Sequence, residues 1–93
     1  MRSLTLADFK PFLRKPMKVK AAAGVFELLL SDAQAIPGSM RDGGGFRLVF
    51  LGPLQPMLGQ GNFRFLVGAE PHEIFIVPLG PVADKMRYEA IFF

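Results

Sequence analysis

The chain has 93 residues, of which 51% are hydrophobic and 20% charged, and its formal net charge is +3. It contains no cysteine and one histidine, which excludes disulfides, thiolate-bound zinc, iron–sulfur clusters and thiol redox chemistry. A chain of this length exposes roughly 5,000 Å² when folded and about 15,000 Å² when unfolded, so we expect one domain over residues 1–93, stabilised by apolar packing.

Residues 4–9 (LTLADF) predict a short N-terminal helix. Thr5 is a suitable N-cap, and Asp8 follows it by three residues, where a capping-box carboxylate belongs. Pro11 should stop or kink this helix after about one turn, because proline lacks the N–H that the helix interior requires. The side chains expected to dock on the core are Phe9, Phe12 and Leu13.

Six short strands separated by glycine- and proline-rich turns are predicted after Pro16. Their ranges are 17–21, 25–30 with an extension toward Ile36 left open, 46–51, 62–67, 73–77 and 86–93. Pro78 should lie at an edge or at the end of the fifth strand, because it cannot donate a ladder hydrogen bond. This pattern predicts an all-β fold, a small six-stranded barrel, roll or sandwich with a short N-terminal helix.

Three segments carry a resemblance: residues 4–9 (LTLADF), residues 52–61 (GPLQPMLGQG), and the closing blocks 74–81 (IFIVPLGP) and 86–92 (MRYEAIF). In this order they resemble a family of small bacterial proteins classed as a domain of unknown function, over nearly the whole chain. That family has no assigned activity, cofactor or catalytic residue, so the resemblance implies none here. Its association with genes for phage-tail-collar-like proteins implies a structural or assembly role.

The candidate metal ligands are few. His72 follows Pro71 in a predicted turn, where we interpret it as an exposed, structurally neutral histidine. Asp32 and Asp42 flank a glycine-rich loop that lacks the spaced oxygen ligands of a calcium motif. We therefore expect no metal and no cofactor.

Paired carboxylates are the remaining route to catalysis. Glu27 and Glu89 lie in predicted strands and could face each other, but exposed cross-strand partners such as Lys18, Lys20 or Arg87 are the favoured interpretation. No serine or threonine stands in a strand-to-helix elbow. We therefore expect a protein that is not an enzyme.

Nucleic-acid binding by a small β-barrel is the alternative function. Residues 1–20 carry six cations and one anion, and residues 21–93 carry five cations and seven anions. Phe63 and Phe65 flank Arg64, which suggests base stacking with phosphate contacts. Alternation instead places both phenylalanines on one face and the arginine on the other, where it is solvated.

Interaction with a protein partner or with a second copy of the chain is the preferred function, as a structural or assembly subunit of a phage-tail-like or surface apparatus. A small chain this rich in phenylalanine and methionine is expected to leave apolar surface exposed, and such patches mark interfaces. Asp8 and Lys10 interrupt any signal-like apolar run, and no apolar stretch is long enough for a membrane span, so a soluble, cytoplasmic protein is the default expectation. The candidate contact residues are Leu54, Met57 and Leu58 in the mid-chain connection and Ile91, Phe92 and Phe93 at the C-terminus.

Overall fold

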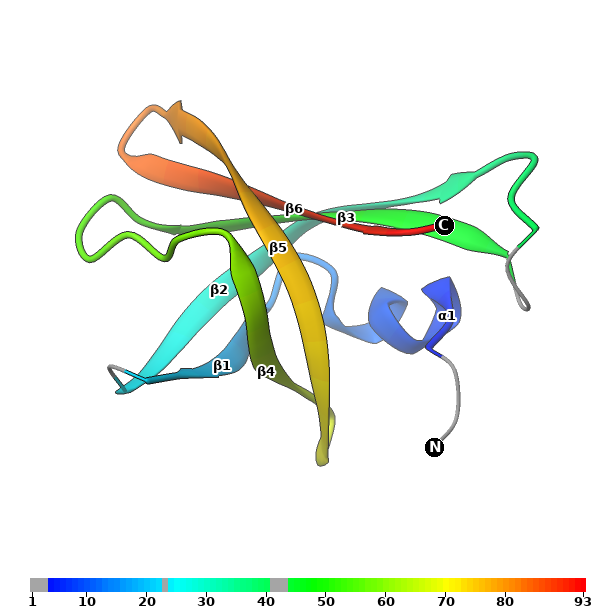
Figure 1. The fold of residues 1–93 in the computed structure, drawn as a ribbon, viewed down its shortest axis with the longest axis horizontal. Helices are drawn as coiled ribbons and strands as arrows, with labels where there is room; N and C mark the ends of the chain where they lie inside the picture. The colour runs from blue at the N-terminus through cyan, green and yellow to red at the C-terminus, as the bar shows by residue number, and fades with distance from the viewer. Residues whose placement is uncertain (1–3, 23, 41–43) are drawn as a thin grey trace.

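Six antiparallel strands close into a barrel with the order β1-β2-β3-β6-β5-β4, and one short helix precedes them (Figure 1). This computed structural model describes residues 4–22, 24–40 and 44–93. The strands are β1 Pro16–Ala21, β2 Gly24–Ile36, β3 Gly45–Pro53, β4 Gly61–Val67, β5 Glu70–Val82 and β6 Lys85–Phe92. The all-β class, the six strands and the N-terminal helix are confirmed, and the barrel is the observed form of the three that the sequence left open.

Two long strands each belong to both sides of the barrel. β2 pairs with β1 up to Leu29 and with β3 from Leu29 onward, with a register shift between Leu30 and Asp32. β5 pairs with β4 over Glu70–Ile76 and with β6 from Val77 onward. The bulge in each strand bends it, so that one strand can leave one sheet and enter the other.

The expectation that the fifth strand ends at Pro78 is wrong. β5 continues to Val82, Pro78 lies opposite Tyr88, and the register shifts between Pro78 and Gly80. A bulge locally interrupts the ladder, so a residue without an N–H is tolerated there inside a continuous strand.

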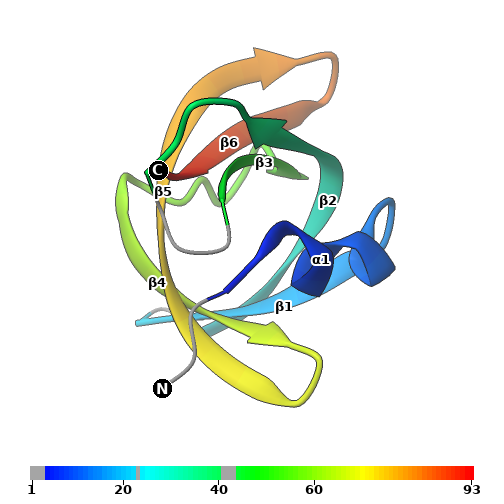
Figure 2. The ribbon, with the colours of Figure 1, turned by 90° about the vertical axis from the view of Figure 1, so that its right-hand side faces the viewer.

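Helix α1 (Leu6–Phe9) and the 3-10 turn η1 (Lys10–Phe12) lie across one open end of the barrel (Figure 2). The Thr5 N–H donates to Asp8 Oδ2 at 2.8 Å, and the Asp8 N–H donates to the Thr5 carbonyl at 3.0 Å. The capping prediction is therefore confirmed. Pro11 lies in η1, where the helix tightens, as its missing N–H requires.

Phe9 fills the barrel beneath this helix. Its side chain is fully buried, and its ring centroid lies 5.7 Å from that of Phe46 and 6.0 Å from that of Phe92. Phe12 packs against the core from a half-buried position, whereas Leu13 stays 39% exposed. Phe9 is therefore the anchor of the N-terminal segment.

The connection 54–60 closes the opposite end, at the left of Figure 1. Leu58 is buried, and its backbone N–H donates to the Tyr88 hydroxyl at 2.8 Å. A buried N–H without an acceptor is costly, so this bond holds the connection against β6. Buried side chains from segments outside the strands therefore help to close both ends of the barrel.

The junction between β1 and β4 is the shortest in the ring. Among the described residues only Val19↔Phe65 and Lys20↔Arg64 pair there, whereas each of the other five strand junctions has at least five ladder pairs. Both Val19 and Phe65 are fully buried, so the barrel closes through interior packing as well as through hydrogen bonds.

Phe9→Ala should destabilise the domain by about 3–5 kcal/mol, because it removes a fully buried ring and leaves a cavity between two other rings. Leu13→Ala, on the same segment but exposed, should change the free energy of unfolding by less than about 1 kcal/mol. Urea unfolding of the two variants measures the difference. Equal losses would show that α1 does not anchor the barrel.

Candidate functional site

His72 does not lie in a turn, which corrects the sequence expectation. It belongs to β5 and pairs with Phe65 of β4 in the ladder. Its side chain is 10% exposed, and Nε2 lies 3.3 Å from Glu70 Oε1. Within the described residues no three His, Asp or Glu side chains gather at metal-binding distance, and Asp42 lies outside those residues.

The two candidate carboxylates do not form a pair. Glu89 on β6 forms an ion pair with Arg47 on β3, in which Arg47 Nε donates to Glu89 Oε2. Glu27 lies opposite Lys18 in the β1–β2 ladder, and β3 runs between β2 and β6. The expected cross-strand cations are therefore present, although Arg47 takes the place that Arg87 was expected to hold.

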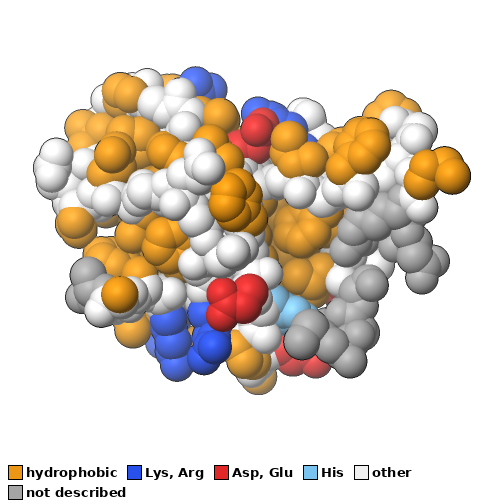
Figure 3. Space-filling view, in the orientation of Figure 1, with side chains coloured by type: hydrophobic (Ala, Val, Ile, Leu, Met, Phe, Trp, Pro, Cys, Tyr) orange, Lys and Arg blue, Asp and Glu red, His pale blue; other side chains and the backbone are white. Residues whose placement is uncertain are grey.

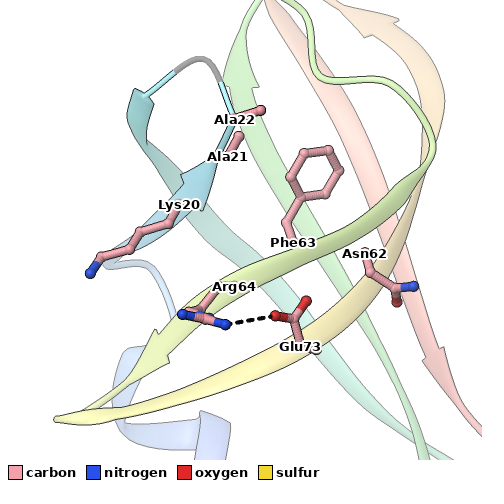
Figure 4. A pocket seen from close by; sticks show the side chains of 7 residues that line it. All are labelled: Lys20, Ala21, Ala22, Asn62, Phe63, Arg64 and Glu73. Carbon is pink, nitrogen blue, oxygen red and sulfur yellow. Dashed lines mark hydrogen bonds and ion pairs between the residues drawn. The ribbon is translucent and has the colours of Figure 1, made fainter.

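An open hollow of about 390 Å³ lies over β1 and β4 (Figure 4). Arg64 crosses to Glu73, with Nη2 at 3.4 Å from Oε1, while the Phe63 ring points the other way, toward Ala21 and Ala22. The ring and the cation therefore do not form one stacking-and-phosphate surface. The residues lining the hollow are Lys20, Ala21, Ala22, Asn62, Phe63, Arg64 and Glu73.

The six predicted contact residues divide into two groups. Leu58 is buried and Phe92 is half-buried, stacked on Phe46 with ring centroids 4.4 Å apart, so neither offers a contact surface as the fold stands. The other four stay exposed: Leu54, Met57, Ile91 and Phe93. These four residues come from two separate segments. Leu54 and Met57 belong to the connection 54–60, whereas Ile91 and Phe93 lie at the C-terminal end of β6 and directly after it.

A larger apolar surface lies outside the sheet made by the second half of β2, β3, β6 and the second half of β5. The central row Leu30, Phe50, Tyr88 and Pro78 runs across all four strands, and its first three members are fully buried. Side chains on either side of that row therefore point outward. We call this the outer face, and its residues are Leu29, Asp32, Arg47, Val49, Leu51, Val77, Leu79, Arg87, Glu89 and Ile91.

Val49 is an outward apolar side chain that its neighbours largely cover. It is 8% exposed, yet it does not belong to the core cluster, and its ladder neighbours are Glu89 and Asp32. Leu29 and Leu51 are direct ladder partners beside it, and with Glu27 and Lys85 they line a second hollow of about 240 Å³. At the far side, Ile91 is 55% exposed.

Arg87 is the unusual charge on the outer face. Its Nε is buried and has no hydrogen-bond partner among the described residues, although its neighbour Glu89 binds Arg47. An unsatisfied nitrogen of this kind costs about 1–3 kcal/mol or more. Figure 3 shows blue and red side chains among orange ones along the upper edge, over β6, whereas another group of basic side chains gathers lower, over β1 and β4.

The sequence alone does not reveal this face, because the face depends on the register between neighbouring strands. Phe46-Arg47-Leu48-Val49 alternates inward and outward, but only the pairing of β3 with β6 shows that Val49 and Glu89 are neighbours. Arg87 was expected to be a cross-strand partner of one of the two carboxylates, but it lies on the same strand as Glu89. The sequence does contain one indication of the face: outward positions of β3 and β5 carry apolar residues where polar ones would be usual.

A family profile described as "Domain of unknown function (DUF6916)" matches residues 4–92, which include the helix and all six strands. No curated protein and no solved structure matches the chain. Within the described residues, no helix has the length and apolar character that a membrane span requires.

Glu89→Ala should lower stability by about 1.5 kcal/mol, since it removes a partly shielded bond between charged groups and leaves Arg47 without its partner. Glu73→Ala breaks the exposed Arg64 pair and should change stability by less than about 0.5 kcal/mol. Thermal unfolding compares the two directly. A larger loss for Glu73→Ala would contradict the burial of the Arg47–Glu89 pair.

Proposed function

The chain belongs to the DUF6916 family of domains of unknown function, and we propose that this domain is a non-enzymatic protein-interaction module that docks on its outer face. The observation that carries the proposal is the run of apolar side chains on the outside of a four-stranded sheet. Ordinarily one face of an antiparallel sheet packs on the core and the other is polar. Here Leu29 and Leu51 are half-buried on outward positions of β2 and β3, outside the core cluster, and Val49 beside them is 8% exposed.

The interior supports the same proposal. Seventeen residues form the core cluster, all of them apolar apart from the Tyr88 hydroxyl, and that hydroxyl is bonded to Leu58. Both hollows are open surface depressions, and the carboxylates Glu73 and Glu27 at their rims lie beside Arg64 and opposite Lys18 respectively. A filled barrel of this kind offers its outside to a partner. An assembly role in a phage-tail-like or surface apparatus is the setting that we propose for such docking.

Ile91→Lys tests the docking surface. A lysine at this 55% exposed position should place a charge in the apolar contact and abolish capture of a partner by the immobilised domain. Val25→Lys is the matched control, since Val25 is 63% exposed but lies on the first half of β2, outside the outer face. The measurement is affinity capture from the cells that encode the chain, followed by mass spectrometry.

A discrete set of proteins retained by the native chain and by Val25→Lys, and lost with Ile91→Lys, would support the proposal. Identical capture by all three forms would show that the outer face is not the docking surface.

Nucleic-acid binding is the second candidate, favoured by the cations Lys18, Lys20 and Arg64 on the outside of β1 and β4. Arg64 lies 3.4 Å from Glu73, and Lys18 is opposite Glu27, so acidic groups flank the basic stripe on both sides. We expect a labelled oligothymidylate to bind more weakly than about 10⁻⁴ M at low salt, by fluorescence anisotropy. Binding tighter than this, with a steep loss in salt, would favour the second candidate instead.

A further inference from the structure

The centre of the outer face, at its β3 and β6 positions, is self-complementary about the central row. On one side of that row lie Leu51 of β3 and Arg87 of β6, which are ladder partners, and on the other side lie Val49 and Glu89, also ladder partners. A half-turn about an axis along the row therefore carries Arg87 onto the position of Glu89 and Leu51 onto that of Val49. Opposite charges and apolar side chains would then meet their complements.

We propose that a second copy of this chain covers the outer face, with the two-fold axis over Tyr88 and with Arg87 of each copy bound to Glu89 of the other. This inference rests on the proposed function and names its partner. A two-fold interface uses the same patch on both copies, so each residue must be compatible with the residue of the second copy that the rotation places opposite it. Arg87 and Glu89, two residues apart on the same face of β6, meet that requirement.

The charges of the face agree with this arrangement. Arg87 has a buried Nε without an acceptor, and Glu89 uses Oε2 for Arg47 while its Oε1 accepts no hydrogen bond among the described residues. In one copy Arg87 and Glu89 do not pair. Across the axis, Glu89 would bridge Arg47 of its own copy and the guanidinium of Arg87 in the second one.

The area of the outer face limits how tightly two copies can bind each other. Four strands about 4.8 Å apart and about six residues long span roughly 20 Å by 20 Å, or about 400 Å² for each copy. The total of about 800 Å² lies below the roughly 1,200 Å² of a stable interface, so the dimer should be weak and concentration-dependent.

The first experiment is sedimentation equilibrium of the full chain between about 10 µM and about 1 mM, the range expected for so small an interface. The native chain should shift from monomer to dimer. Arg87→Glu should raise the dissociation constant at least about tenfold, because it sets like charges opposite one another. Lys85→Glu makes the same charge change one outward position away and should raise it by less than about threefold. Circular dichroism checks that each variant is folded.

The second experiment does not depend on Arg87. Because the chain has no cysteine, Leu79→Cys introduces one thiol at the β5 bulge beside the axis, and Val25→Cys introduces one on the opposite sheet. A short bismaleimide should cross-link two copies through Leu79→Cys and not through Val25→Cys. Both side chains are exposed, so thiol access is not what distinguishes them.

A concentration-dependent dimer that Arg87→Glu weakens and that Leu79→Cys traps would support the inference. A chain that stays monomeric up to 1 mM, a dimer indifferent to Arg87→Glu, or cross-linking through Val25→Cys would overturn it. If the chain is monomeric and Ile91→Lys still abolishes capture of another protein, the second copy is rejected while the docking function stands.

Discussion

The structure depends on one geometric constraint. β2 and β5 must each pair with one strand along their first half and with a different strand along their second half. A strand can do so only by bending, and the bulges at Leu30/Asp32 and Pro78/Gly80 provide the bends. Where the two sides part, the barrel is left with two open ends. Phe9 fills one and Leu58 the other, so side chains from outside the sheet complete a core that six short strands do not enclose alone.

The same constraint shapes the surface. Once the sheet of β2, β3, β6 and β5 has turned its phenylalanines inward, every second residue is committed to the outside. On β1 and β4 those outward residues include Lys20 and Arg64, which suit water. On β3 they include Val49 and Leu51, which do not, and the Arg47–Glu89 pair lies among them. The two sides of one barrel therefore present different chemistry to the surroundings.

Local signals predicted the local parts of this architecture. The Thr5–Asp8 capping box and the six strands depend on capping and short-range periodicity, which a single sequence displays. The errors concern relations between distant segments. His72 was placed in a turn because Pro71 precedes it, yet the ladder with β4 keeps the strand continuous.

Leu58 and Arg87 show why the site was harder to predict than the fold. Residues 54–60 have no periodicity, so nothing local indicates that Leu58 turns inward to the Tyr88 hydroxyl. The pairing of Arg47 with Glu89 follows from the register of β3 on β6, which separates the two residues widely in sequence. The sequence favoured Arg87 as a cross-strand partner, and the structure leaves its Nε without a partner among the described residues.

Because the β1–β4 junction is short, the backbone amides around the barrel should not all be equally protected from hydrogen exchange with solvent. Its two ladder pairs join segments from distant parts of the chain, so closing them carries the entropy cost of a long loop. β3, by contrast, has seven ladder pairs with β2 and eight with β6. Amide hydrogens on the facing edges of β1 and β4 should therefore exchange with deuterium through local opening, while those of β3 wait for the whole domain to unfold.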